Sequence, residues 1–318
     1  MGEEKTERKE LELMKKARFV VWLTIGYLIL DIIILYFTMQ SSQAMKAAWI
    51  EDLLYLIPSI SFLIASKIAT KPASKNFRFG YDRAYTIGFL LSSFALFTIG
   101  VYLLIESLLK LVNHEVVTIG TTSIFGETIW FGWLMILAIG YGIVPVFLIG
   151  KEKLKISKKV NIQILYVDAK GQKADWLTSV ATIFGIVGIG FGLWWADAVA
   201  AIVIALDILS DGVKSLKAAT SEAMDRTPLN AFLQKEEPLV KKIEELVQNE
   251  DWVKDSLVRF RRSGNKVTGE ILVMSQTEEN LQENIHELKE KITNFNWQIT
   301  EVVVSPVKEF PEIFDKKI

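Results

Sequence analysis

Long apolar segments constrain the fold of this chain more than any other feature. About 20 consecutive apolar residues are needed to cross the hydrocarbon core of a bilayer, and 51% of the 318 residues are hydrophobic. The fifth apolar segment is interrupted by the polar stretch DAKGQKAD. The sequence predicts a multi-pass bundle of six membrane-spanning helices, at Ala17–Met39, Ala44–Lys67, Ala84–Val112, Thr128–Gly150, Asn161–Leu193 and Trp195–Leu216.

Basic residues gather in alternate connections between these segments. They are frequent before the first segment, between the second and third, and between the fourth and fifth, where the sequence reads KEKLKISKK. The other connections contain few, such as Lys46 and Lys110. By the positive-inside rule both termini are cytoplasmic, and we expect the protein in the cell (plasma) membrane. The N-terminus carries charges of both signs, unlike a cleaved signal, so we expect the first span to be retained.

The chain becomes polar after the sixth segment. Helical periodicity in QKEEPLVKKIEELVQ and EENLQENIHELKEKITN, a hairpin pattern around Ser263–Gly264–Asn265 and a final strand in WQITEVVVSP give the order αββαβ. We predict a cytoplasmic tail at 1–16, a transmembrane domain at 17–220 and a cytoplasmic α/β domain at 231–310. The fold class is therefore an all-α membrane bundle followed by a small ferredoxin-like domain.

Composition excludes several kinds of function. The chain has no cysteine, which removes disulfides, thiolate metal sites and cysteine nucleophiles. Its two histidines, His114 and His286, lie far apart, and we expect one in a loop and one on a helix surface, neither as a ligand. The net charge of −1 gives no reason to expect nucleic acid as a partner.

Acidic residues lie deep inside the predicted spans, where a charge costs about 3 kcal/mol. Glu51 lies 16 residues from Lys67, and Asp175 lies 16 residues from Lys159. At 1.5 Å per residue, both lie about 24 Å above the cytoplasmic boundary, and Asp31 lies about 20 Å above it. Three acids on different helices therefore share a level.

Carboxylates at this depth are tolerated where they line a water-filled cavity or bind a cation. We predict four metal ligands and four residues that line the path or support the ligands. Each has a structural alternative, such as a position at the membrane interface, helix packing, or ion pairs with Lys170, Lys173 and Lys214. The predicted ligands are Glu51, Asp175, Asp52 and Asp168, and the supporting residues are Asp31, Tyr55, Asp207 and Asp211. We expect Asp197 to act at the start of its own helix, where an acid suits the dipole.

The order of elements and two local motifs resemble the cation diffusion facilitator (cation efflux) family. KPASKNFRFGYDRAY, at Lys71–Tyr85, is similar to the family's loop after the second span. The segment from Trp194 to the exit MDRTP at Met224–Pro228 is similar to its sixth span. The resemblance implies a homodimeric transporter in the lipid bilayer, not an enzyme, with no prosthetic group. Its substrates would be divalent metal ions (Zn, Mn, Fe, Co or Cd) exchanged for protons.

The resemblance also implies a transport site of four ligands, two on the second span and two on the fifth. The matching positions hold Glu51 and Tyr55, and Gly171 and Asp175, so each pair keeps one acid. Positions where the family usually has Asp and His in a cytoplasmic loop hold Ser74, Phe77 and Tyr81. The family further implies a salt bridge that links the membrane part to the cytoplasmic domain at the dimer interface, between Arg83 and Asp225.

Oxygen ligands without thiolate or imidazole suit Mn²⁺ or Fe²⁺, although Zn²⁺ binds more tightly wherever it is available. An empty cluster of acids repels itself, so we expect it to hold a proton that entering metal displaces. One alternative is an intramembrane aspartyl protease, but YVD at Tyr166–Asp168 and GIGFG at Gly188–Gly192 match its YD and GxGD motifs poorly. The other is a non-transporting family member that acts as a membrane scaffold or metal-responsive interaction protein.

Overall fold

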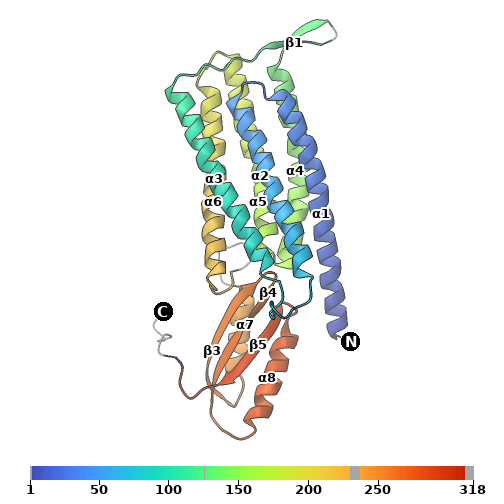
Figure 1. Ribbon diagram of the computed structural model, residues 1–318, viewed down its shortest axis with the longest axis vertical. Helices are drawn as coiled ribbons and strands as arrows, with labels where there is room; N and C mark the ends of the chain where they lie inside the picture. The colour runs from blue at the N-terminus through green and yellow to red at the C-terminus, as the bar shows by residue number, and fades with distance from the viewer. Residues whose placement is uncertain (1, 125, 230–236, 312–318) are drawn as a thin grey trace.

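The computed structural model describes residues 2–311 apart from residue 125 and residues 230–236, without the side chains of 2–10, 124, 170, 171 and 173–177. Within these residues six long helices form one bundle, with a strand hairpin at one end and a small α/β domain at the other (Figure 1). We call these the hairpin end and the small-domain end. The helices are α1 (Gly2–Thr38), α2 (Gln43–Ala69), α3 (Ala84–Val112), α4 (Gly132–Val160), α5 (Gln163–Gly190) and α6 (Ala196–Ala223).

The outer surface of the bundle is apolar. Large side chains such as Phe19, Phe94 and Leu137 are 66%, 59% and 68% exposed, and a water-soluble monomer rarely exposes so many large apolar groups together. Among the described residues, α1 from Leu11 onward, α2, α3 and α4 are long and apolar enough to cross a membrane. The protein is therefore a membrane helical bundle followed by a small α/β domain.

The fourth apolar segment begins differently from the prediction. Its first residues form a strand, β2 (Glu127–Trp130), which pairs antiparallel with β1 (Thr121–Ile124), and α4 begins only at Gly132. β-Branched residues favour this hairpin, and Gly126 adopts the positive φ of 89° that its turn requires. The predicted start at Thr128 was therefore wrong by about one helical turn.

The other end of α4 also differs. The basic stretch KEKLKISKK continues the helix to Val160, and only Asn161, with a left-handed φ of 54°, and Ile162 separate it from α5. Twenty-nine helical residues span about 43 Å, which exceeds the ~30 Å hydrocarbon core. The basic residues of this stretch thus belong to the last turns of a helix, and not to a loop.

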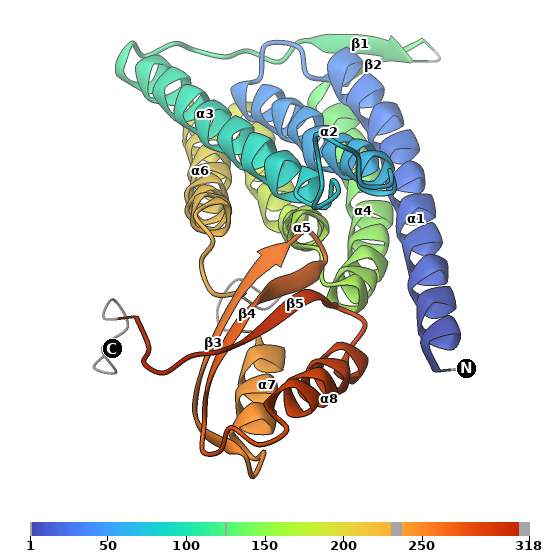
Figure 2. The same ribbon diagram turned by 60° about the horizontal axis from the view of Figure 1, so that its bottom comes forward.

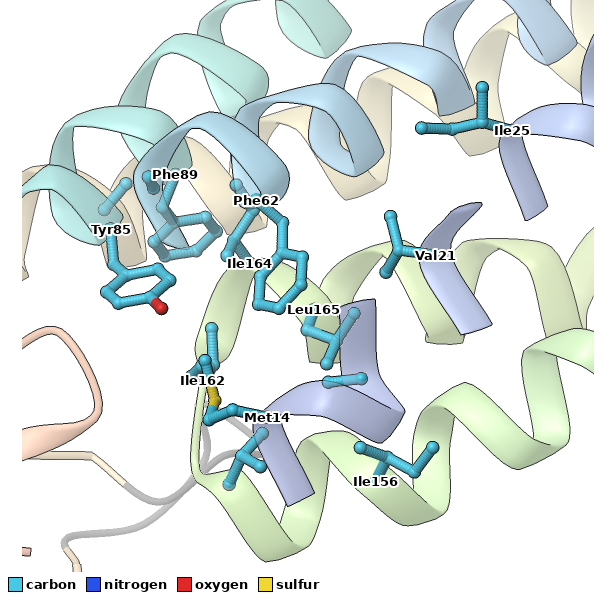
Figure 3. Close-up of a cluster of buried hydrophobic side chains, with 14 residues drawn as sticks. Met14, Val21, Ile25, Phe62, Tyr85, Phe89, Ile156, Ile162, Ile164 and Leu165 are labelled. Carbon is cyan, nitrogen blue, oxygen red and sulfur yellow. The ribbon is translucent and has the colours of Figure 1, made fainter. Parts of the chain in front are cut away.

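A buried apolar cluster holds the small-domain end of the bundle together (Figure 3). The rings of Phe62 on α2 and Tyr85 on α3 lie 6.1 Å apart, centroid to centroid. In a membrane bundle such a cluster stabilises the helices by van der Waals packing, because lipid tails are as apolar as these side chains, and the cluster includes side chains from all six long helices. Its buried members are Met14, Ala17, Val21, Ile25, Phe62, Ala65, Tyr85, Phe89, Ile156, Val160, Ile162, Ile164, Leu165 and Ala219.

The small domain has the predicted αββαβ order. Its elements are α7 (Pro238–Gln248), β3 (Val253–Ser263), β4 (Lys266–Ser275), α8 (Leu281–Phe295) and β5 (Ile299–Pro306). β4 lies between β3, to which it is antiparallel, and β5, to which it is parallel. Figure 2 shows α7 and α8 together on one face of this sheet. Residues 231–236, where the sequence predicts the domain to begin, lie outside the described residues.

The turn between β3 and β4 docks on the small-domain end of the bundle. Gly264 has a φ of +65°, and a Cβ there would lie 2.7 Å from the Asp82 carbonyl oxygen and 2.8 Å from the Tyr85 ring. Glycine is therefore required here both by backbone conformation and by space.

An ion pair lies beside this turn. Lys266 Nζ lies 3.7 Å from the Asp82 carboxylate. Burial raises the pKa of Asp82, and the charge of Lys266 opposes that rise.

We expect Gly264→Ala to weaken this docking by about 1–2 kcal/mol, because a left-handed conformation is costly for alanine and its methyl group would clash. Hydrogen–deuterium exchange of the β3–β4 hairpin in the detergent-solubilised chain should become faster. Gly120→Ala is the matched control, since nothing lies within 4 Å of a Cβ at that position. Equal exchange in the two variants would contradict the requirement for glycine.

Candidate metal-transport site

Four carboxylates line one cavity inside the bundle. Glu51 comes from α2, Asp168 from α5, and Asp207 and Asp211 from α6. The cavity has a volume of about 20 Å³, which is room for about one water molecule or ion. Its remaining lining residues are Leu54, Tyr55, Pro58, Val167, Leu96 and Ile208.

The four acids lie at different depths along the bundle. Glu51 is eight residues from the start of α2, about 12 Å from the hairpin end. Asp207 and Asp211 lie about 16 and 22 Å from the start of α6, and Asp168 lies only about 8 Å from the small-domain end of α5. The acids that line the cavity thus come from several levels between Glu51 and the small-domain end.

Two of the predicted residues on α2 contact each other. The Tyr55 hydroxyl donates a hydrogen bond of 3.0 Å to Glu51 Oε1, across one helical turn. Glu51 and its neighbour Asp52 are both buried, at 3% and 5% exposure. Glu51 lines the cavity, but Asp52 does not. The 100° between adjacent helical residues explains this difference.

The remaining predicted site residues either lie apart from this cavity or have side chains outside the described residues. Asp31 is buried on α1 against α4, where its Oδ2 lies 2.8 Å from the position that a Cβ on Gly142 would take. Gly171 has no side chain to offer a ligand, and the side chain of Asp175 lies outside the described residues, so the role of Asp175 stays a prediction. Among the side chains that are described, no three His, Cys, Asp or Glu residues gather closely enough to hold a metal ion.

Asp168 has a partner that the sequence did not suggest. Lys153 Nζ on α4 lies 2.6 Å from Asp168 Oδ2, and the Ser59 hydroxyl donates to the same oxygen at 2.9 Å. The side chains of Lys153 and Asp168 are 1% and 0% exposed. From its composition, the stretch around Lys153 was predicted to be a basic loop between two spans. Lys153 lies inside the bundle because α4 continues to Val160. The predicted partners Lys170 and Lys173 have side chains outside the described residues.

Asp197 closes the hairpin end of the bundle in a way that differs from the prediction. It is fully buried and accepts hydrogen bonds from the Ser42 hydroxyl at 2.6 Å, from the Gln43 amide, and from the Ala44 amide at 3.1 Å. It therefore caps the start of α2, and not only the start of its own helix α6. A carboxylate is favourable there because the first N–H groups of a helix have no intrahelical acceptor.

Ion pairs connect the bundle to the small domain. Arg83 Nη2 lies 2.5 Å from Asp225 Oδ1, and Arg261 Nη1 lies 2.9 Å from Asp225 Oδ2. The guanidinium of Arg262 is buried and donates to the carbonyl oxygens of Asn161, at 2.9 Å, and Leu229, at 2.5 Å. Burial lowers the pKa of Arg262, while nearby glutamates oppose that shift.

The two histidines lie away from the cavity. His114 packs against Trp194 at the hairpin end, with ring centroids 4.6 Å apart. His286 is 74% exposed on α8, with Nε2 3.6 Å from Glu290 Oε1. Both positions agree with the expectation that these are a loop and a helix-surface residue.

Comparison with known proteins decides the family. Residues 17–223 match the family described as the cation efflux transmembrane domain. The chain belongs to the cation efflux family. The matched residues cover α2, α5 and α6, whose acids line the cavity. The resemblance seen in the sequence is therefore confirmed.

Three curated relatives of this cation efflux protein are metal transporters by name. The manganese efflux system protein MneS of Bacillus subtilis (strain 168) is 26% identical over 257 residues, which is 79% of this chain and 80% of the relative. A cadmium, cobalt and zinc/H(+)-K(+) antiporter of the same organism is 29% identical over 72% of this chain and 70% of the relative. The antiporter of that name from Bacillus velezensis (strain DSM 23117 / BGSC 10A6 / LMG 26770 / FZB42) is 31% identical over 53% of this chain and 50% of its own length.

Proposed function

We propose that this member of the cation efflux family exports a divalent metal ion in exchange for protons, through the cavity lined by Glu51, Asp168, Asp207 and Asp211. The observation that carries the proposal is that four acids from three helices line one cavity inside a membrane bundle. Acids buried in a membrane domain characteristically mark ion paths and proton relays. The proposal includes Asp175 and Asp52 as further ligands, with Asp31 and Tyr55 in support.

The chemistry of the cavity favours a hard divalent ion. Carboxylates and the Tyr55 hydroxyl offer oxygen atoms alone, which suit Mn²⁺ and Fe²⁺, while Zn²⁺ has the higher intrinsic affinity for most sites. The names of the relatives, which mention manganese, cadmium, cobalt and zinc, agree with this range. Carboxylates buried in one cavity favour a bound cation or protons over uncompensated charge, so we expect metal and protons to be exchanged for one another.

The proposal includes an orientation of the protein in the membrane. All six long helices cross the bilayer of the cell membrane, and the small domain and the start of α1 face the cytoplasm. In support, α1 begins at the end of the bundle where the small domain lies (Figure 1), and basic residues gather at that end. The family resemblance further supports a homodimer in which the Arg83–Asp225 pair lies near the interface.

Mn²⁺ flux into proteoliposomes tests the transport function. An acidic lumen should accelerate Mn²⁺ uptake, and collapse of the proton gradient should slow it. Glu51→Gln removes one charge at nearly constant size, and we expect it to lower the initial rate at least about tenfold, a loss of about 1.4 kcal/mol.

Glu152→Gln is the matched control because Glu152 is an exposed acid on α4, outside the cavity. It should transport at the rate of the unaltered chain. If the unaltered protein moves no metal under any gradient, the transport proposal is wrong and the non-transporting alternative is favoured.

A further inference from the structure

Lys153 is a buried lysine to which the proposed exchange of metal for protons assigns no role. It lies on α4 and reaches Asp168 on α5 and Ser59 on α2, with Nζ 2.6 Å from Asp168 Oδ2 and 3.4 Å from Ser59 Oγ. The side chain is 1% exposed. A charge buried this deeply is stable only when it is paired, and Asp168 supplies the opposite charge.

The partner of Lys153 belongs to the cavity. Asp168 lines it together with Glu51, Asp207 and Asp211, so one fixed positive charge lies behind its acid nearest the small-domain end. Both Lys153 and Ser59 bind Oδ2, and Oδ1 accepts no hydrogen bond from the described residues. Asp168 therefore keeps one oxygen for another ligand while the other is held by an ammonium group.

We propose that Lys153 is a tethered cation that competes with the transported metal for Asp168 and so sets how tightly metal binds at the small-domain end of the path. This inference rests on the proposed transport function. An ammonium ion 2.6 Å from a carboxylate oxygen repels a divalent ion that approaches the same group, because charges interact strongly at such distances away from bulk water. Metal must therefore displace Lys153 or bind more weakly than the bare acids would allow.

Binding of Mn²⁺ to the full-length chain in detergent micelles tests this directly, with free Mn²⁺ measured by electron paramagnetic resonance. Lys153→Met keeps the length of the side chain and removes the charge, and we expect it to bind Mn²⁺ at least about tenfold more tightly than the unaltered chain. Lys153→Arg keeps the charge and should bind as the unaltered chain does. Adding Asp168→Asn to Lys153→Met should abolish the gain.

A purely structural lysine predicts a different result. If Lys153 only ties three helices together, Lys153→Met would bind Mn²⁺ equally or more weakly, and either outcome overturns the proposal. So does a gain that survives Asp168→Asn. Lys153→Gln, which keeps a hydrogen-bond donor without the charge, carries the test if the methionine variant does not fold.

The measurement also separates this inference from the proposed function. Metal binding is measured in micelles, where no transport occurs, and transport is measured with the unaltered chain, without any Lys153 variant. Transport by the unaltered protein with no gain in Lys153→Met overturns only the role of Lys153. A gain in binding with no transport by the unaltered protein overturns only the exporter.

Discussion

Asp168→Ala is expected to destabilise the folded bundle by about 3–5 kcal/mol, because it leaves the Lys153 ammonium buried without a counter-ion. The two side chains are 1% and 0% exposed, so water cannot replace the lost partner. Tryptophan fluorescence during heating should show the loss, since the chain has nine tryptophans. A change of that size corresponds to a fall in melting temperature on the order of 5–10 °C.

An exposed ion pair on the same helix provides the control. Lys155 and Glu152 lie 2.6 Å apart, as Lys153 and Asp168 do, but their side chains are 58% and 49% exposed. Exposed pairs contribute about 0–1 kcal/mol, so Glu152→Ala should leave the melting temperature nearly unchanged. The double variant Lys153→Met/Asp168→Ala should recover most of the stability. Equal melting temperatures for Asp168→Ala and Glu152→Ala would show that the buried pair does not hold the helices.

Arg262→Ala should detach the β3–β4 hairpin from the bundle. The guanidinium binds the carbonyl oxygens of Asn161, between α4 and α5, and Leu229, after α6, and lies 3.3 Å from Glu237 Oε2. Its removal leaves buried acceptors without donors, at about 1–3 kcal/mol for each unsatisfied group. We expect a loss of about 3–4 kcal/mol in docking, read as faster hydrogen exchange in the hairpin and at Asn161.

Arg259→Ala is the comparison on the same strand. Arg259 pairs with Glu270 at 2.6 Å, but the two side chains are 42% and 43% exposed, within the small domain. Its loss should change hydrogen exchange little. Comparable exchange at Asn161 in both variants would mean that Arg262 does not fasten the domain to the bundle.

The periodicity of apolar residues and the length of the hydrophobic segments were enough to predict most of the fold. The apolar runs predict the bundle helices, and the alternation around Ser263–Gly264–Asn265 predicts a turn that the structure places between β3 and β4. The start and end of α4 were not predictable in the same way. A hydropathy pattern cannot tell the residues of β2 from a helix start, and a run of lysines reads as a loop although lysine is a good helix former.

The candidate site was predictable in part, since counting along helices singles out buried acids but not their partners. Glu51, Asp168, Asp207 and Asp211 line one cavity, and their role in transport stays a prediction. Asp31 lies instead against α4, because depth in the membrane says nothing about which side of a helix a residue occupies. Lys153 was missed because its role depends on a contact between α4 and α5 that no spacing rule reports.

Pro58 gives the cavity wall a property that a regular helix lacks. It lies inside α2 and lines the cavity together with Leu54, one turn earlier. Proline has no N–H group, so the carbonyl oxygen of Leu54 lacks the donor that position 58 would otherwise supply. An uncharged oxygen is thereby free of its helical bond between the levels of Glu51 and Asp168, and α2 can bend there without breaking a backbone hydrogen bond. The helix that carries Glu51 thus lacks one backbone hydrogen bond beside the cavity, and it bends more easily there than an uninterrupted helix would.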